Sequence, residues 1–117
     1  MPSHFPRRGE IYLASARTRS GERKRRPVLI ISPDVRNRWA SDVLTIPLST
    51  TIRPAPEHVL LDRGECGLPY SSAVKCEQVS SLDKTLLDPH PTGRPLSDHR
   101  MRQVEDALLV ALGIFHR

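Results

Sequence analysis

One short segment constrains the fold of this chain more than any other: residues 28–32, with the sequence Val-Leu-Ile-Ile-Ser. The run is continuous, apolar and rich in β-branched residues, which favours a strand buried in the centre of a sheet. Pro27 precedes the run and has no N–H to donate to a sheet ladder. We therefore predict that a central strand begins at Pro27.

Four consecutive cations lie directly before this predicted strand, at positions 23–26. The strand start places Arg26 where loop meets rigid sheet and leaves the other three cations, Arg23, Lys24 and Arg25, mobile in solvent. A positioned guanidinium backed by loose positive charge suits a site that binds phosphate, because guanidinium groups form paired, charge-assisted hydrogen bonds with phosphate oxygens. The alternative is that the basic run is only a solvated loop.

Four further segments have the features of short strands bounded by turn-forming residues: 9–14, 43–48, 57–61 and 71–79. Between the strands, the polar and basic residues 16–25 predict a mobile loop, and residues 33–41 predict a turn or short irregular segment. Five short strands separated by turn signals predict a small antiparallel barrel.

The end of the chain has a different periodicity, which predicts one amphipathic helix. Ser97 is a good N-cap, Asp98 suits the first turn, and Gly113 suits the position after the helix. One helical face carries the apolar residues of this segment, which are Met101, Val104, Leu108, Ala111 and Leu112. We expect this face to pack on the barrel.

The charge of the chain is unevenly distributed. The 117 residues fit a single domain, residues 1–117, with a formal net charge of +5. Eight of the 18 Lys and Arg residues lie in the first 26 positions, against two carboxylates, Glu10 and Glu22. A one-sided basic field favours a polyanion, most commonly nucleic acid, although an acidic protein partner fits the same field.

Several classes of site and location are disfavoured by the sequence. Cys66 and Cys76 have no zinc-site spacing, and no HExxH motif, acidic cluster or phosphate-binding glycine loop is present, so we expect no metal and no cofactor. The N-terminus lacks an apolar signal region, and the longest apolar stretch, residues 107–115, is too short to span a bilayer. We expect a soluble cytoplasmic protein with reduced thiols.

Taken in order, the short motifs of this chain resemble the MazF/PemK family of toxin endoribonucleases. The matching segments are Arg8-Gly9-Glu10-Ile11-Tyr12, residues 26–32, Asp34 with Asn37-Arg38, residues 43–50, Pro56-Glu57-His58-Val59, residues 72–79, Leu82-Asp83-Lys84, Gly93-Arg94, Leu96-Ser97 and residues 107–113. The resemblance covers nearly the whole chain. It implies an SH3-like antiparallel barrel of the MazF/PemK/CcdB type with a C-terminal helix, a homodimer, and an antitoxin partner that blocks the RNA groove.

The resemblance also implies roles for three residues at the reaction centre. Arg26 matches the family's key arginine before proline and is assigned to the scissile phosphate; the alternative is a structural pair with a carboxylate. Ser49 stands where the family usually has threonine, and Thr50 follows it, so either hydroxyl can hydrogen-bond the phosphate or the 2′-OH. The alternative for Ser49 is a turn residue at a strand end.

The reaction needs a base, and the candidates in this sequence are acidic and imidazole side chains. Glu77 matches a position where one branch of the family places an acid, and Lys75 lies two residues earlier, so a continuous strand would direct both to one face. The alternative is a fixed ion pair. His58 titrates near neutrality and is a further candidate, although a lone strand histidine is more often structural. Glu22 in the basic loop is another candidate base, although a salt bridge within the loop is the favoured alternative.

The function that these expectations imply is sequence-specific, metal-independent cleavage of single-stranded RNA, with a 2′,3′-cyclic phosphate and a 5′-OH as products. We expect RNA contacts from Arg23, Lys24, Arg25, Arg53, His58 and Lys75. Two alternatives stay open on the residues alone. One is a non-catalytic basic barrel that binds RNA or an acidic protein, and the other is a DNA-binding regulator.

Overall fold

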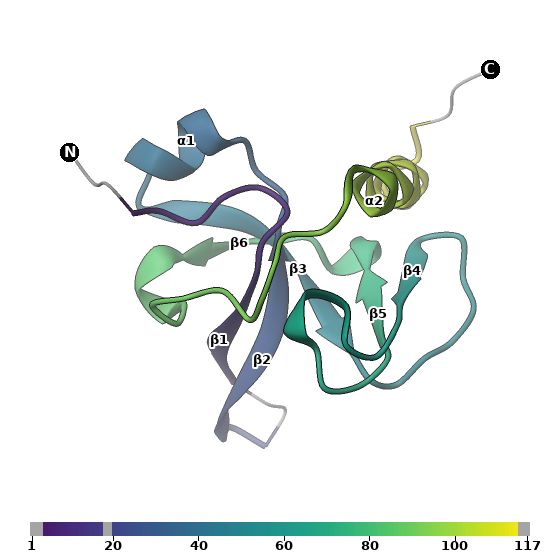
Figure 1. Ribbon diagram of the computed structural model, residues 1–117, viewed down its shortest axis with the longest axis horizontal. Helices are drawn as coiled ribbons and strands as arrows, with labels where there is room; N and C mark the ends of the chain where they lie inside the picture. Colours follow the sequence, from purple (N-terminus) through teal and green to yellow (C-terminus); the bar gives the residue numbers. More distant parts are fainter. Residues whose placement is uncertain (1–3, 18–19, 115–117) are drawn as a thin grey trace.

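The computed structural model describes residues 4–17 and 20–114 (Figure 1). These residues form a six-stranded antiparallel sheet and two helices. The strands are β1 (Ile11–Arg17), β2 (Arg23–Ile30), β3 (Asp42–Ser49), β4 (His58–Leu61), β5 (Ser72–Lys75) and β6 (Ser80–Asp83). The helices are α1 (Asp34–Trp39) and α2 (Asp98–Ala111), and three single 3-10 turns are η1 (Glu65–Gly67), η2 (Cys76–Gln78) and η3 (Lys84–Leu86).

Strand β3 organises the sheet, because it pairs with three other strands along its length. The order is β1-β2-β3-β5-β4, and β6 pairs with the first half of β3 while β5 pairs with its last two residues. In Figure 1, β3 runs through the centre with β6 on one side and β5 and β4 on the other. The mainly antiparallel class with a C-terminal helix is confirmed, but β1 and β4 do not pair, so the sheet is open rather than a closed barrel.

The outer edge of β1 is covered by the segment that leads to α2. Backbone amides of this segment donate to β1 and the residues just before it: Asp88 to Leu13 (2.9 Å), Thr92 to Ile11 (2.8 Å) and Leu96 to Gly9 (2.9 Å). Satisfying these carbonyls hides an edge that would otherwise be open to pairing with another chain.

The predicted start of the central strand at Pro27 is wrong, and so is the predicted loop over residues 16–25. The β1–β2 ladder continues out to the pair Arg17–Arg23, so most of that segment is a two-stranded hairpin. The sheet accommodates Pro27 because β2 pairs with β3 only over residues 28–30. Pro27 is therefore paired with β1 alone, and its missing N–H leaves no gap in the β2–β3 ladder. The four cations therefore lie on a strand, and Thr18 and Arg19 lie outside the described residues.

Two further segments differ from the sequence prediction. Residues 34–39 form the short helix α1 instead of an irregular turn; the Lys84 ammonium donates to the carbonyls of Asn37 (2.7 Å) and Ala40 (2.9 Å) at its end. The single predicted strand 71–79 is interrupted by η2 after Lys75, and the chain then forms β6, which was not predicted. Strands β3 and β4 were predicted correctly.

Helix α2 closes the main core, as expected from its apolar face. The Ser97 hydroxyl caps it by accepting from the amide of Arg100 (3.2 Å). Met101, Val104 and Ala107 are buried, whereas Leu112 is 56% exposed, so the predicted face was wrong by including Leu112 and omitting Ala107. Neither helix in the described residues has the length and apolarity needed to cross a bilayer.

Adjacent leucines on β4 test the assignment of the two faces of the sheet. Leu61 is fully buried in the main core, and its neighbour Leu60 is 48% exposed. We expect Leu61→Ala to lower the free energy of unfolding by about 2–5 kcal/mol, because it leaves a cavity. Leu60→Ala should change it by less than about 1 kcal/mol. Urea denaturation of both variants checks this, and equal losses would contradict the assignment.

Candidate functional site

The strands β3, β5 and β4 present two faces of opposite character. Side chains alternate along a strand, and directly paired residues share a face. Leu48, Val74 and Val59 pair across the three strands and are buried in the main core. The next row, which we call the outer face, contains Ser49, Ala73 and Leu60.

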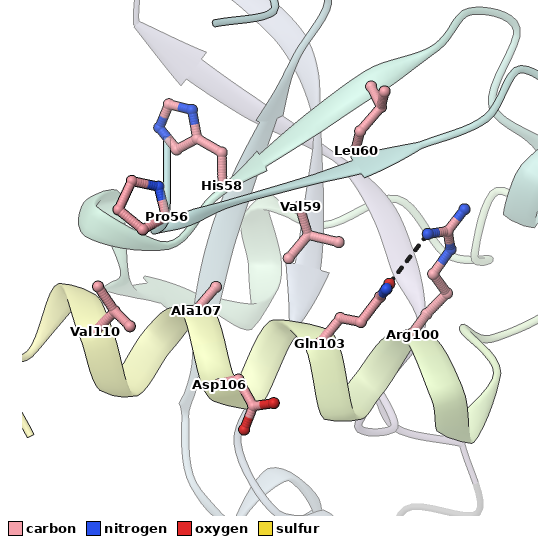
Figure 2. Close-up of a pocket in the computed structure, with 9 residues that line it drawn as sticks. All are labelled: Pro56, His58, Val59, Leu60, Arg100, Gln103, Asp106, Ala107 and Val110. Atoms are coloured by element: carbon pink, nitrogen blue, oxygen red, sulfur yellow. Dashed lines mark hydrogen bonds between the residues drawn. The ribbon is translucent and has the colours of Figure 1, made fainter. Parts of the chain in front are cut away.

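The outer face extends from the Ser49 row to His58 and Lys75, which are paired residues two positions further along β4 and β5. Figure 2 shows His58 and Leu60 on the side of β4 away from α2, while Val59 points toward the helix. A groove of about 440 Å³ lies between β4 and α2. Arg100 lines this groove and donates hydrogen bonds to the side chains of Gln103 (3.0 Å; Figure 2) and Glu65 (2.8 Å).

Arg26 belongs to the same outer face. It is two residues from Val28, which pairs with Pro47 on β3, so continuing the two strands carries Arg26 toward Ser49. The side chain of Arg26 is exposed, and within residues 4–17 and 20–114 it makes no hydrogen bond and no ion pair. A free guanidinium on a rigid strand is available to an external anion.

Strand geometry divides the four cations between two sides of the hairpin. Arg23 and Arg25 alternate with Lys24 and Arg26 along β2 and therefore point to the opposite side. Arg23 donates to the Ser15 hydroxyl (3.1 Å), and Arg25 forms an ion pair with Asp88. The structure thus brings Lys24 and Arg26 to the outer face and separates them from Arg23 and Arg25.

Ser49 and Thr50 lie where β3 ends beside this arginine. The Ser49 hydroxyl accepts a hydrogen bond from the amide of Thr51 (3.1 Å), which leaves its own proton available for donation. Thr50 is exposed, and its side chain lines a cavity together with Pro27, the residue after Arg26. The shared lining places the end of β3 beside the middle of β2.

His58 and Glu77 form a hydrogen-bonded pair at the other end of the outer face. His58 Nε2 lies 3.0 and 3.1 Å from the two carboxylate oxygens of Glu77, and His58 Nδ1 lies 3.0 Å from the carbonyl oxygen of Arg53. Both partners accept hydrogen bonds, so both ring nitrogens must donate and the ring is an imidazolium when Glu77 is ionised. The pair also fixes the loop that carries Arg53.

The electrostatics of the pair agree with this protonation state. Burial opposes charging of His58, but the hydrogen bonds to Glu77 and to the Arg53 carbonyl outweigh it and raise the His58 pKa above its ordinary value. For Glu77, burial raises the pKa of the carboxyl group, but the hydrogen bond from His58 lowers it, and the net result is a lowered pKa. Both shifts favour the charged forms, a carboxylate on Glu77 and an imidazolium on His58.

A titration tests this pair. Its stabilising effect should be complete between the ordinary pKa values of the two groups, 4.5 for Glu77 and 6.5 for His58. The effect is lost as pH rises from 6.5 through the raised His58 pKa, and as pH falls from 4.5 through the lowered Glu77 pKa. We expect the His58 pKa, followed by NMR, to lie above 6.5 and to drop in Glu77→Gln. Glu57→Gln removes a weaker influence and should lower it less. An unchanged His58 pKa in Glu77→Gln would contradict the pairing.

Lys75 and Glu77 are not related as the sequence predicted. Glu77 lies in the 3-10 turn η2 rather than on a strand, so the alternation argument that put both on one strand face is wrong. Lys75 still lies opposite His58 in the β4–β5 register, and its charge contributes to the lowered pKa of Glu77. The turn, rather than the strand, brings Glu77 to His58.

The remaining candidates lie apart from this group. Glu22 is exposed at the tip of the β1–β2 hairpin. Cys76 is buried, and burial is the main reason that the pKa of its thiol is raised to about 11. Among the described residues, no three His, Cys, Asp or Glu side chains gather into a group able to hold a metal ion. No sequence motif indicated the Arg53 carbonyl as a partner of His58, because a backbone acceptor leaves no signature in side-chain pattern.

Comparisons with known proteins agree with this architecture. Residues 7–112 match the family model for the PemK-like, MazF-like toxin of type II toxin-antitoxin systems. The chain is 33% identical over 112 residues to the endoribonuclease MazF of Staphylococcus saprophyticus, and the match covers 92% of each chain.

Solved structures give the same picture. A mycobacterial endoribonuclease in complex with its cognate antitoxin superimposes with a TM-score of 0.80 at 28% identity, over 96% of this chain and 99% of that one. The Mycobacterium tuberculosis toxin MazF-mt6 shares the fold, with a TM-score of 0.78 at 24% identity over 92% and 99% of the two chains. The family match over residues 7–112 and the close curated relative show that this chain belongs to the PemK-like, MazF-like toxins of type II toxin-antitoxin systems.

Proposed function

We propose that this endoribonuclease toxin cuts single-stranded RNA at a short recognition sequence, by attack of a substrate 2′-OH on the adjacent phosphate. The observation that carries the proposal is the exposed guanidinium of Arg26, which has no partner in the described residues and shares the outer face with the Ser49 hydroxyl. Part of the outer face is covered, since Ala73, Leu60 and His58 line a cavity of about 250 Å³ together with residues 52–55, whereas Arg26 at its other end is exposed to an incoming RNA strand.

Arg26 and Ser49 are assigned to the scissile phosphate. In the reaction the 2′-oxygen bonds to phosphorus and the bond to the 5′-oxygen breaks; the 2′-OH proton passes to a base and the 5′-oxygen takes up a proton from water, giving a 2′,3′-cyclic phosphate and a 5′-OH. Negative charge concentrates on the phosphate oxygens in the transition state. A permanently charged guanidinium and a hydroxyl donor stabilise that charge, and Thr50 supplies a second hydroxyl at the same strand end.

Proton transfer is assigned to the other end of the outer face. Glu77 is a carboxylate at neutral pH and accepts the 2′-OH proton, while His58 holds the carboxylate in position. Neighbouring strands are roughly 4.8 Å apart, so β2 and β5 are separated by about 10 Å across β3. Side chains as long as arginine and glutamate, with the RNA between them, suit that span. Lys75 and Arg53 border this end and contact neighbouring phosphates.

The reaction needs no metal in this proposal, because its nucleophile is part of the substrate. Hydrolysis by an activated water often uses a metal to lower the pKa of that water. Here the 2′-OH is already adjacent to phosphorus, and a carboxylate suffices to remove its proton as the bond forms. The same requirement restricts cleavage to RNA, because DNA lacks the 2′-OH.

The proposal includes protein partners. One mycobacterial relative was solved in complex with its cognate antitoxin, and we infer that an antitoxin neutralises this toxin as well. The charge that attracts RNA also favours an acidic antitoxin segment over the outer face. From the family resemblance we further propose a homodimer, which sedimentation at several protein concentrations tests.

A modified RNA tests the chemistry directly. Once a cut site is mapped, the nucleotide on its 5′ side is replaced by the 2′-deoxy form in an otherwise unchanged RNA. We expect cleavage at that position to stop while the RNA still binds with similar affinity. A control RNA with the deoxy substitution several nucleotides away should be cut normally. Cleavage of the first RNA would show that the 2′-OH is not the nucleophile.

A further inference from the structure

We infer that the base of the nucleotide on the 5′ side of the cut inserts into the cavity between residues 52–55 and the outer face. This inference rests on the proposed function and extends it from the reaction to recognition of the RNA sequence. The sheet residues of the cavity are Ala73, Leu60 and His58, and all three belong to the outer face. The cavity therefore lies on the same side of the sheet as Arg26 and Ser49.

The cavity has the size and lining of a site for one small planar group. Its volume is about 250 Å³, just below the roughly 300–1,000 Å³ of pockets that hold drug-sized ligands. The loop supplies the apolar residues Ile52, Pro54 and Ala55, and the sheet supplies Leu60. Leu60 is 48% exposed, so a ligand in the cavity would remove its side chain from water. That burial favours a group with apolar faces.

Hydrogen bonds hold the loop in place at both of its ends. The amide of Thr51 donates to the Ser49 hydroxyl (3.1 Å), and the amide of His58 donates to the carbonyl of Ala55 (3.0 Å). Between these two bonds, His58 Nδ1 donates to the carbonyl of Arg53 (3.0 Å). The cavity is therefore formed before RNA arrives, and binding does not have to order the loop.

The cavity lies between the two ends of the proposed reaction centre. Ala73 is the direct ladder partner of Ser49, and the Cβ atoms of such partners are about 5 Å apart. His58 is hydrogen-bonded to Glu77, which is assigned as the base (3.0 Å). The ribose that loses its 2′-OH proton must lie between Ser49, which holds its 3′-phosphate, and Glu77. The base of that same nucleotide is one glycosidic bond away and is the part of the substrate that reaches the cavity.

His58 offers the cavity a ring surface rather than a hydrogen bond. Both ring nitrogens are already engaged, Nε2 by Glu77 and Nδ1 by the Arg53 carbonyl. The side chain lines the cavity and is 12% exposed, so what a ligand meets is part of a positively charged aromatic ring in a fixed orientation. Proteins recognise single-stranded RNA by splaying its bases out and stacking them on aromatic side chains, including histidine. The exposed Leu60 adds apolar contact to that surface.

The place of the cavity favours a substrate base over an antitoxin side chain as its occupant. An apolar protein side chain would fill the cavity, but nothing would require it to lie beside the scissile phosphate. A nucleotide satisfies both sites at once, because its base fills the cavity while its 3′-phosphate contacts the Arg26 guanidinium, which has no partner in the described residues.

Filling the cavity, in combination with removing the base, tests the inference. The RNA pair is an intact substrate and the same RNA with an abasic ribonucleotide, which keeps its 2′-OH, on the 5′ side of the cut. Loss of the base should lower the wild-type kcat/KM roughly ten- to hundred-fold, the range for loss of one stacked base. Leu60→Phe should lower kcat/KM on the intact RNA by a similar factor and cut the abasic RNA as fast as wild type does.

Two further variants of the full chain accompany this test. Ile52→Phe fills the cavity from the loop side, at a residue that is 42% exposed, and should behave like Leu60→Phe. Leu112→Phe makes the same leucine-to-phenylalanine change at a 56% exposed position outside the cavity and should match wild type on both RNAs. Binding of the RNA pair with 2′-deoxyribose at the cut, which prevents turnover, should show the same preference for the base in wild type and none in Leu60→Phe.

The outcomes separate the inference from the proposed function. If wild type cuts the abasic RNA as fast as the intact RNA, or if Leu60→Phe loses activity equally on both, the inference is overturned while the cleavage chemistry stands. Unchanged cleavage with weakened antitoxin binding in Leu60→Phe assigns the cavity to the protein partner and also overturns it. Absence of any wild-type cleavage overturns both.

Discussion

Replacing Arg26 with alanine should reduce RNA cleavage by at least roughly 10²–10³-fold, the loss that follows removal of one preorganised donor to a developing negative charge. The guanidinium is exposed and unpaired in the described residues, so its loss removes no structural contact. The free energy of unfolding should accordingly change by less than about 0.5 kcal/mol. Initial cleavage rates and urea denaturation of the same preparation measure the two effects separately.

Arg23→Ala is the matched control, because it removes the same charge from the same strand. Arg23 points to the opposite side of the hairpin and donates to Ser15. We expect the cleavage rate to fall only a few-fold, because the hairpin attracts RNA less strongly with one charge fewer. The dependence of cleavage on salt concentration should not become steeper. Equal losses of activity in the two variants would show that only the total charge of the hairpin matters. That outcome would contradict the assignment of Arg26 to the phosphate.

The second large effect is expected at Gly67, where two backbone segments cross. A Cβ at Gly67 would overlap the carbonyl oxygen of Thr92, and a Cβ at Gly93 would lie 2.6 Å from the backbone of Cys66. Gly67 also has a φ of +78°, which disfavours any other residue. Neither backbone can yield easily, since Thr92 is bonded to Ile11 through its amide and to Cys66 through its hydroxyl.

We therefore expect Gly67→Ala to cost at least about 4 kcal/mol of unfolding free energy, at the upper end of single-substitution effects. Gly64→Ala is the control: its φ is +91°, but nothing lies within 4 Å of the added Cβ. That variant should cost about 1–2 kcal/mol, the price of the left-handed conformation alone. Urea denaturation compares them, and equal losses would mean that the crossing is not tightly packed.

The sequence predicted the parts of the fold that bury an apolar pattern. The run at residues 28–31 and the apolar face of α2 are examples, because burial on one side leaves a periodicity that can be read directly. Strand β6 left no such pattern, since its residues are mostly exposed and it is held by its ladder to β3. Helix α1 has six residues, which is too short for a helical period to appear.

The hairpin shows why local rules failed around the cations. A proline and a polar, basic segment normally mark a loop, but here β1 provides a complete partner for residues 23–29. Whether a partner strand exists depends on the whole topology and not on the segment itself. The error mattered for function, because a loop would leave all four cations equivalent, whereas a strand directs Lys24 and Arg26 to one side and Arg23 and Arg25 to the other.

The members of the site could be proposed from the sequence, but their contacts could not. His58 and Glu77 were separate candidates, and only the fold shows that the two are hydrogen-bonded across 19 positions of sequence.

The most direct test of the account is to map the ends that the purified protein generates on a long RNA in the presence of EDTA. We predict cuts at a discrete sequence, with a 2′,3′-cyclic phosphate on the upstream fragment and a 5′-OH on the downstream fragment, and none with Arg26→Ala. Cuts that require added divalent metal, or that leave a 5′-phosphate, would contradict attack by the 2′-OH and with it the roles given to Arg26, Ser49 and Glu77.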